Sequence, residues 1–152
     1  MNRLAVAACI AVAGCTSLDT ADAVQCCAGF GFDARPILGD HAIDCGVFNA
    51  FAPKAHGDAS QRALRCALRA QRDGRAFVYR RVDSDMVDSG GEAVAVFGQQ
   101  GERIYVAHVF TTDEDHTEGG ACGRLVVLKS GEFDGGPCDP QHPSFQRLLI
   151  PR

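Results

Sequence analysis

Several signals that commonly assign a function are missing from this chain of 152 residues. It contains no G-x-S-x-G and no H-E-x-x-H motif, which are signatures of serine hydrolases and zinc proteases. It has no C-x-x-C pair and no cysteines at zinc-finger spacing with paired histidines, so the cysteines are not expected to bind a metal. No cofactor is expected either. Lysine is scarce, with 2 residues against 13 arginines, and the formal net charge is −4. A chain with this acidic balance is not expected to bind nucleic acid.

The apolar segment near the N-terminus, residues 4–13, is too short to cross a membrane as a finished helix. It has 10 residues, whereas a transmembrane helix needs about 20. Arg3 precedes the segment and small residues follow it, which is the layout of an export signal. We therefore expect residues 1–14 to be a signal peptide that is cleaved on export.

A short tetrapeptide ends this segment: Val12, Ala13, Gly14 and Cys15. It resembles the lipobox of bacterial lipoproteins, in which an aliphatic residue and two small residues precede a cysteine. The resemblance covers these four positions and implies that Cys15 receives a diacylglycerol, becomes the first residue after cleavage and is acylated. Two or more acyl chains anchor a protein stably. Because Thr16 and not an aspartate follows, the resemblance implies sorting to the outer membrane. The alternative is an ordinary cleaved signal in which Cys15 has no such role.

The rest of the chain has the length of one ordinary domain. Residues 16–25 are small and polar without strand alternation, so we expect residues 15–25 to form a lipidated tether. Residues 26–152 are expected to form a single globular domain. Its first part, residues 26–54, is rich in glycine, proline and aspartate, and we expect it to be irregular apart from short extended pieces.

Residues 58–74 carry the clearest helix pattern. Asp58 and Gln61 form a capping box, alanine and leucine dominate the interior, and Gly74 supplies a stop. Strand-like segments follow at residues 77–82, 92–97, 103–112 and 124–129, and a last extended piece at 145–150 is interpreted as an edge strand. Short connections favour an antiparallel meander. The sequence thus predicts an α+β fold with one helix packed on a four- or five-stranded antiparallel sheet.

The cysteines divide by their expected roles. Cys9 leaves with the signal and Cys15 is the lipidation site, so six remain, which in an exported protein favours disulfides: Cys26, Cys27, Cys45, Cys66, Cys122 and Cys138. We favour a bridge between Cys45 and Cys66, before and on the helix, and a bridge between Cys122 and Cys138, around the last clear strand. The adjacent Cys26 and Cys27 have Cα atoms about 3.8 Å apart, below the range of an unstrained disulfide. Either one favoured bridge is wrong, or this pair forms a strained ring, or it bonds between chains.

Charge on the expected helix supplies the clearest candidate for a binding surface. At 100° per residue the small side chains of Ala63, Cys66, Ala67 and Ala70 share one face. Four arginines, which we call the arginine face, lie on the opposite one: Arg62, Arg65, Arg69 and Arg72. These guanidinium groups could meet anionic lipid headgroups, lipopolysaccharide phosphates or an acidic partner. A solvated helix face is the simpler explanation.

Two polar segments are weaker candidates for chemistry. Asp40, His41 and Asp44 lie beside Cys45 in the sequence. The acidic residues 113–118 are expected to form a loop, but their spacing does not match a calcium-binding EF-hand, so a solvated loop is the simpler explanation. His108 is expected on the apolar face of its strand, where a hydrogen-bonded core histidine is the common explanation. No catalytic residue is assigned.

These features predict a lipid-anchored protein of the outer membrane whose domain is a non-catalytic binding or assembly module. Its expected partners are the membrane itself, an envelope protein or anionic lipid. The alternative is a small periplasmic hydrolase or divalent-metal-binding protein that uses Asp40, His41 and Asp44 or residues 113–118. A concave pocket with convergent polar side chains would favour the hydrolase, whereas an exposed apolar patch would favour the binding module.

Overall fold

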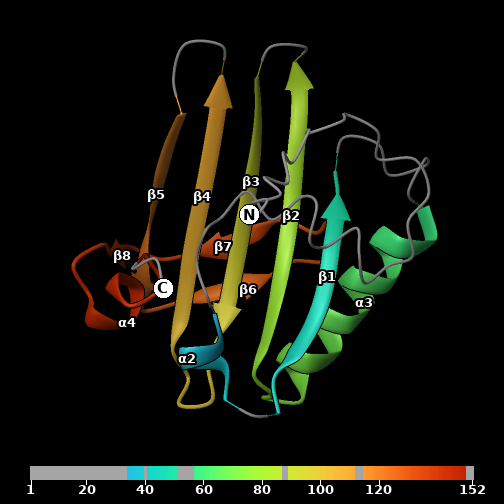
Figure 1. The fold of residues 1–152 in the computed structure, drawn as a ribbon. Coiled ribbons are helices and arrows are strands. Elements are labelled where there is room, and N and C mark those ends of the chain that lie inside the picture. The colour runs from blue at the N-terminus through green and yellow to red at the C-terminus, as the bar shows by residue number, and fades with distance from the viewer. Residues whose placement is uncertain (1–33, 40, 51–56, 87–88, 112–114, 150–152) are drawn as a thin grey trace, which may run out of the picture.

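The computed structural model describes residues 34–39, 41–50, 57–86, 89–111 and 115–149. Three helices are described: α2 (Arg35–Leu38), α3 (Gly57–Arg72) and α4 (Pro143–Gln146). The strands are β1 (Ile43–Asn49), β2 (Phe77–Met86), β3 (Ser89–Phe97), β4 (Arg103–Thr111), β5 (Asp115–Cys122), β6 (Leu125–Val127), β7 (Phe133–Gly135) and β8 (Cys138–Asp139). They form a six-stranded sheet in the order β1-β2-β3-β4-β5-β8 and a two-stranded sheet of β6 and β7 (Figure 1).

The large sheet combines one parallel pair with an antiparallel meander. β1 runs parallel to β2, and α3 connects the two strands. From β2 to β5 each strand pairs antiparallel with the next. The domain is therefore α+β, as the sequence predicts. The sheet has six strands instead of the four or five expected. It is mixed because β1 and β2 are parallel, and α3 supplies the long crossover that a parallel pair needs.

Small side chains let α3 lie close to β1 and β2. Ala67 is fully buried, and Ala63 and Ala70 are nearly so. At the start of the helix, the Ser60 hydroxyl accepts a hydrogen bond of 3.0 Å from the backbone N–H of Asn49 at the end of β1. At the other end, the Gln71 side chain makes two hydrogen bonds to the backbone of Val127 in β6, of 2.8 and 3.1 Å. The helix is thus fixed to both sheets, and its predicted extent is confirmed to within two residues.

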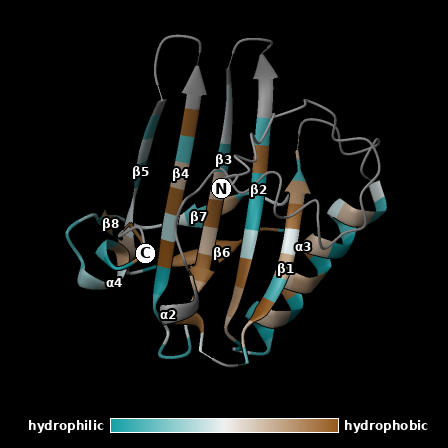
Figure 2. Cartoon of the chain, in the orientation of Figure 1, coloured by the Kyte–Doolittle hydropathy of each residue, from teal (hydrophilic) through white to brown (hydrophobic). Residues whose placement is uncertain are grey.

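Each face of the large sheet carries its own hydrophobic core. On one face, α3 and the β6–β7 hairpin cover an aromatic cluster in which the rings of Phe77 and Phe97 stack with centroids 4.1 Å apart. On the opposite face, α2 and α4 cover aliphatic side chains of the central strands: Val94, Val96, Ile104 and Val106. Figure 2 shows hydrophobic stretches along β3 and β4, and both hydrophilic and hydrophobic stretches along α3.

Several segments differ from the sequence expectations. Within residues 26–54, expected to be irregular apart from short extended pieces, residues 35–38 form the helical turn α2 and residues 43–49 form the seven-residue strand β1. Most of the acidic segment forms part of β5 instead of a loop. Residues 124–129 contribute only the short strand β6, which pairs with β7 outside the large sheet. The expected edge strand at residues 145–150 is wrong, because Pro143 starts the helical turn α4 and the backbone N–H of Ser144 donates to the His142 ring at 3.2 Å.

Two disulfides fasten the sheet at its margins. Cys45–Cys66 joins β1 to α3, and Cys122–Cys138 joins the end of β5 to β8. These are the two pairs that the sequence favoured. Cys26 and Cys27 lie outside the described residues, as do Cys15, the expected signal peptide and the expected tether.

Candidate functional site

Of the polar cluster expected beside Cys45, Asp44 has a structural role. The Asp44 carboxylate accepts hydrogen bonds of 2.8 and 3.0 Å from Arg80 on β2 and one of 2.9 Å from the backbone N–H of Gly46. His41 is exposed, and Asp40 lies outside the described residues. Asp44 is therefore an ion-pair partner that joins β1 to β2.

The acidic segment likewise does not gather a metal site in the part of the chain that is described. Residues 113–114 lie outside that part, and His116, Thr117 and Glu118 are exposed on β5. Among the described residues, no three histidine, cysteine, aspartate or glutamate side chains come together in a way that could hold a metal ion. The structure therefore gives no support to the metal-binding alternative from these residues.

β5 is a largely open edge of the large sheet. β8 pairs with β5 only at Ala121 and Cys122, so residues 115–120 are paired with β4 alone among the described strands. Figure 1 shows β5 at the margin opposite α3, and Figure 2 shows that its side chains are mainly hydrophilic. An open edge presents backbone N–H and C=O groups with which another extended chain can pair.

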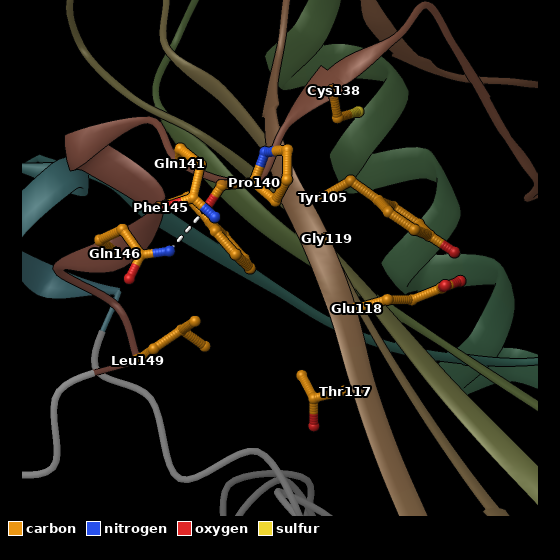
Figure 3. A pocket seen from close by; sticks show the side chains of 10 residues that line it. All are labelled: Tyr105, Thr117, Glu118, Gly119, Cys138, Pro140, Gln141, Phe145, Gln146 and Leu149. Carbon is orange, nitrogen blue, oxygen red and sulfur yellow. Dashed lines mark hydrogen bonds between the residues drawn. The ribbon is translucent and has the colours of Figure 1, made fainter.

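A pocket of about 530 Å³ lies along this edge, where β5 meets α4 and the segment after β8 (Figure 3). Figure 3 shows Tyr105 and Glu118 pointing to one side, while Phe145 and Leu149 lie on the other. The pocket therefore straddles the edge strand. Its lining residues are Tyr105, Thr117, Glu118, Gly119, Cys138, Pro140, Gln141, Phe145, Gln146 and Leu149.

Close packing and a disulfide hold the walls of this pocket. A Cβ atom on Gly119 would collide with the carbonyl oxygen of Tyr105 and lie 2.9 Å from the Phe145 ring, so glycine is what allows α4 to approach β5. The Gln146 amide donates a hydrogen bond of 2.6 Å to the carbonyl oxygen of Pro140, which ties α4 to the segment after β8. The disulfide at Cys138 holds β8 itself against β5.

The groups that line the pocket suit binding better than catalysis. Its polar groups are two glutamine amides, a threonine hydroxyl, the Glu118 carboxylate and the Tyr105 phenol. Burial, together with the negative charge of Glu118, raises the pKa of Tyr105, so the phenol stays protonated. Amides and a neutral phenol orient a ligand by hydrogen bonds but are poor general bases. Leu149, with 41% of its surface exposed, adds an apolar contact at the rim.

A buried carboxylate that sequence reasoning did not single out lies within the large sheet. Glu92 on β3 is 8% exposed, and its Oε1 atom has no hydrogen-bond partner. Burial raises the pKa of Glu92 to about 7, and the positive charge of Arg80 partly opposes this shift. His108 stands opposite Glu92 in the β3–β4 register and is half-buried. The sequence does contain a signal for the burial of Glu92. Glu92 lies two and four residues before the apolar Val94 and Val96, so the three side chains share one face of the strand.

The arginine face is exposed on α3 as expected. Its four arginines point away from the alanine face that contacts the sheet. Arg72 pairs with Asp73 at 3.0 Å. This surface and the pocket beside β5 are two separate candidates for binding.

Comparisons with known proteins return no relative, since no protein family, no curated protein and no solved structure matches this chain. Among the described residues, no helix combines the length and the apolar character needed to cross a membrane. The functional argument therefore rests on the two surfaces described above and on the N-terminal sequence.

Proposed function

We propose that this chain is a lipid-anchored outer-membrane protein whose domain is a non-catalytic module that binds an extended segment of another envelope protein. The observation that carries the binding role is the open edge of β5 with a pocket beside it. The lipobox resemblance at Cys15 supports the anchor. The two disulfides are consistent with export, because disulfides persist in oxidising compartments.

An extended segment fits this site in two ways. Its backbone can pair with the open groups of residues 115–119, which supplies affinity. Every second side chain of the added strand would then point toward the α4 side, where Phe145 and Leu149 offer an apolar contact. The exposed Glu118 carboxylate favours a basic residue on the opposite side of the added strand. The partner we propose is therefore a protein segment with alternating apolar and basic residues.

A hydrolase is the weaker candidate. Asp44 is occupied by Arg80 and the backbone of Gly46. The pocket beside β5 is lined by amides, apolar side chains, the Tyr105 phenol, the Thr117 hydroxyl and the exposed Glu118 carboxylate. Thr117 and Glu118 are neighbours on one strand, so their side chains point to opposite faces. Hydrolysis needs a nucleophile or activated water with a general base within reach. The lining residues do not supply that pair.

Site-specific photo-crosslinking in the bacterial envelope tests the binding role. A photoreactive residue replaces Thr117 on β5 in the full chain, and a matched control carries it at Gln100, which is exposed in the turn between β3 and β4. We expect a protein adduct from position 117 and none from position 100. Leu149→Asp in the same chain should reduce the adduct, because it places a charge at the apolar rim. Equal adducts from both positions would contradict the proposal, and an adduct with a second copy of this chain would replace the partner by a homodimer.

Labelling with radioactive palmitate tests the anchor separately. The wild-type chain should incorporate label, and Cys15→Ser should lose it, because the thiol is the site of the first acyl transfer that the lipobox implies. Labelling of the Cys15→Ser variant at the wild-type level would overturn the anchor but leave the binding role of β5 intact.

A further inference from the structure

The arginine face is an exposed row of cations with few partners. The exposed residues of α3 are Asp58, Gln61 and the four arginines of this face. Arg62, Arg65 and Arg69 form no ion pair with any described residue, and the pair between Arg72 and Asp73 is itself exposed. Arg62 and Arg72 lie ten residues apart on the helix, so the row extends over about 15 Å.

This row stands out against the charge of the whole chain. Residues 57–75 contain five arginines and two aspartates, whereas the full chain has a net charge of −4. The rest of the chain is therefore strongly acidic, and the charge distribution is polarised. A molecule of this kind is attracted to an anionic surface only when α3 faces that surface.

The composition of the face favours a lipid surface over a protein. Binding energy in protein interfaces is concentrated in tryptophan, tyrosine and arginine side chains that are buried in well-packed, water-excluding surroundings. α3 exposes arginines but no aromatic or large aliphatic side chain that could surround them. The large hydrophobic residues that are exposed in the described part are Leu128 and Leu149. Leu149 follows α4, and Leu128 follows Val127, which Gln71 contacts near the end of α3, so neither belongs to the arginine face. Guanidinium groups bind phosphate through paired hydrogen bonds and need no apolar neighbour.

The position of α3 in the fold determines where the β5 edge lies when α3 contacts a membrane. α3 packs on β1 and β2, while the open edge is four strands away at β5. Neighbouring strands are about 4.8 Å apart, so the two margins are separated by roughly 19 Å. Figure 1 shows them on opposite sides of the domain. A membrane in contact with α3 would therefore leave the β5 edge outside the contact, at the other margin of the sheet.

We infer that the arginine face docks on the anionic phospholipid headgroups of the membrane that holds the anchor, and that this contact leaves the β5 edge free to bind its partner. The inference rests on the proposed function for the tether that brings the domain to the membrane and for the partner of the β5 edge. Each arginine near an anionic bilayer surface raises binding about fivefold, and the effect falls off within a Debye length of about 10 Å at 0.1 M salt. The docked orientation should therefore dominate at low salt and be lost at high salt.

Arginine modification on vesicles tests the contact. The full lipidated chain is bound to vesicles of phosphatidylglycerol with phosphatidylethanolamine and, separately, to vesicles of phosphatidylcholine. A dicarbonyl reagent then modifies accessible guanidinium groups, and mass spectrometry reads each arginine. We expect the arginine face to react roughly tenfold more slowly on the anionic vesicles than on the neutral ones. Arg124 and Arg147, which are exposed elsewhere, should react equally on both.

Two matched variants carry the same change in charge. Substituting Arg62 and Arg65 by glutamine should strongly reduce the protection of Arg72, whereas substituting Arg124 and Arg147 by glutamine should preserve it. Circular dichroism checks that both variants fold. Equal reactivity of the arginine face on both vesicle types would overturn the inference.

Flotation of the same samples separates this inference from the anchor. A chain that floats with both vesicle types but shows no protection has the anchor and lacks the docking. A chain that floats only with anionic vesicles, with its arginine face protected, docks without an anchor.

Discussion

At the scale of single residues, Glu92 is a buried carboxyl group, and burial disfavours its charged form. Its pKa is raised by burial from 4.5 to about 7 in the folded chain. The folded state therefore holds this proton more tightly than the unfolded chain does. It follows that the contribution of Glu92 to stability is present below about pH 4.5, declines as the pH rises to about 7 and stays low above that value.

We expect Glu92→Gln to raise the free energy of unfolding at alkaline pH by on the order of 1–3 kcal/mol, because glutamine keeps the shape of the protonated acid and never ionises. At pH values below 4.5 the variant and the wild type should be similar. Urea unfolding at a series of pH values measures both effects. Glu132→Gln, at an exposed position, serves as the control and should leave the pH dependence unchanged. If Glu92→Gln keeps the wild-type pH dependence, Glu92 is not the group that titrates in this window.

Alternation along a strand is a property that can be seen in the sequence, and it places Glu92 with the buried Val94 and Val96. The same rule correctly predicts that His108 shares a face with Ile104 and Val106. What it does not predict is that His108 stands opposite Glu92, because that neighbour depends on strand order and register. Charged residues at buried positions can thus be found from the sequence, whereas their partners require the fold.

At the scale of elements, the contact between α3 and the sheet depends on the small size of Ala67. This side chain is fully buried in the core that α3 shares with β1 and β2. We expect Ala67→Leu to lower the free energy of unfolding by about 1–3 kcal/mol, because the added atoms overfill the contact. Thermal unfolding measures the change. Ala59→Leu, at a half-buried position of the same helix, is the control, since leucine and alanine have similar helix propensities. Equal stability of the two variants would show that helix spacing does not limit packing here.

The sequence predicts correctly those helices and strands in which apolar residues recur at a regular spacing. α3 and the strands β2, β3 and β4 repeat their apolar residues regularly, and each was expected near its observed place. The sequence predicts only unplaced short extended pieces where β1 lies, because the pairing of β1 with β2 shifts register between Asp44 and Val47 and this interrupts the alternation. β5 was missed because an open edge strand carries polar side chains, and these resemble a loop. The pocket depends on β5, so it could not be predicted either.

At the scale of the whole molecule, the two surfaces proposed for binding lie at opposite margins of one sheet. The arginine face belongs to the margin formed by α3 and β1, and the pocket belongs to the margin formed by β5 and α4. Each margin also carries one disulfide. The sequence predicted both bridges but not this arrangement, because the order of strands in the sheet follows from the β1–α3–β2 crossover.

The two disulfides should contribute similarly to stability and differently to binding. They join residues 21 and 16 positions apart, and closing loops of this size stabilises a fold by about 3 kcal/mol. Urea unfolding should therefore show comparable losses for the double variants Cys45→Ala with Cys66→Ala and Cys122→Ala with Cys138→Ala. Only the second pair should weaken crosslinking from position 117, because it releases β8 beside the pocket while the first acts at the far margin. Equal loss of crosslinking in both variants, measured where both remain folded, would mean that the pocket responds to global stability and not to the local hold of β8.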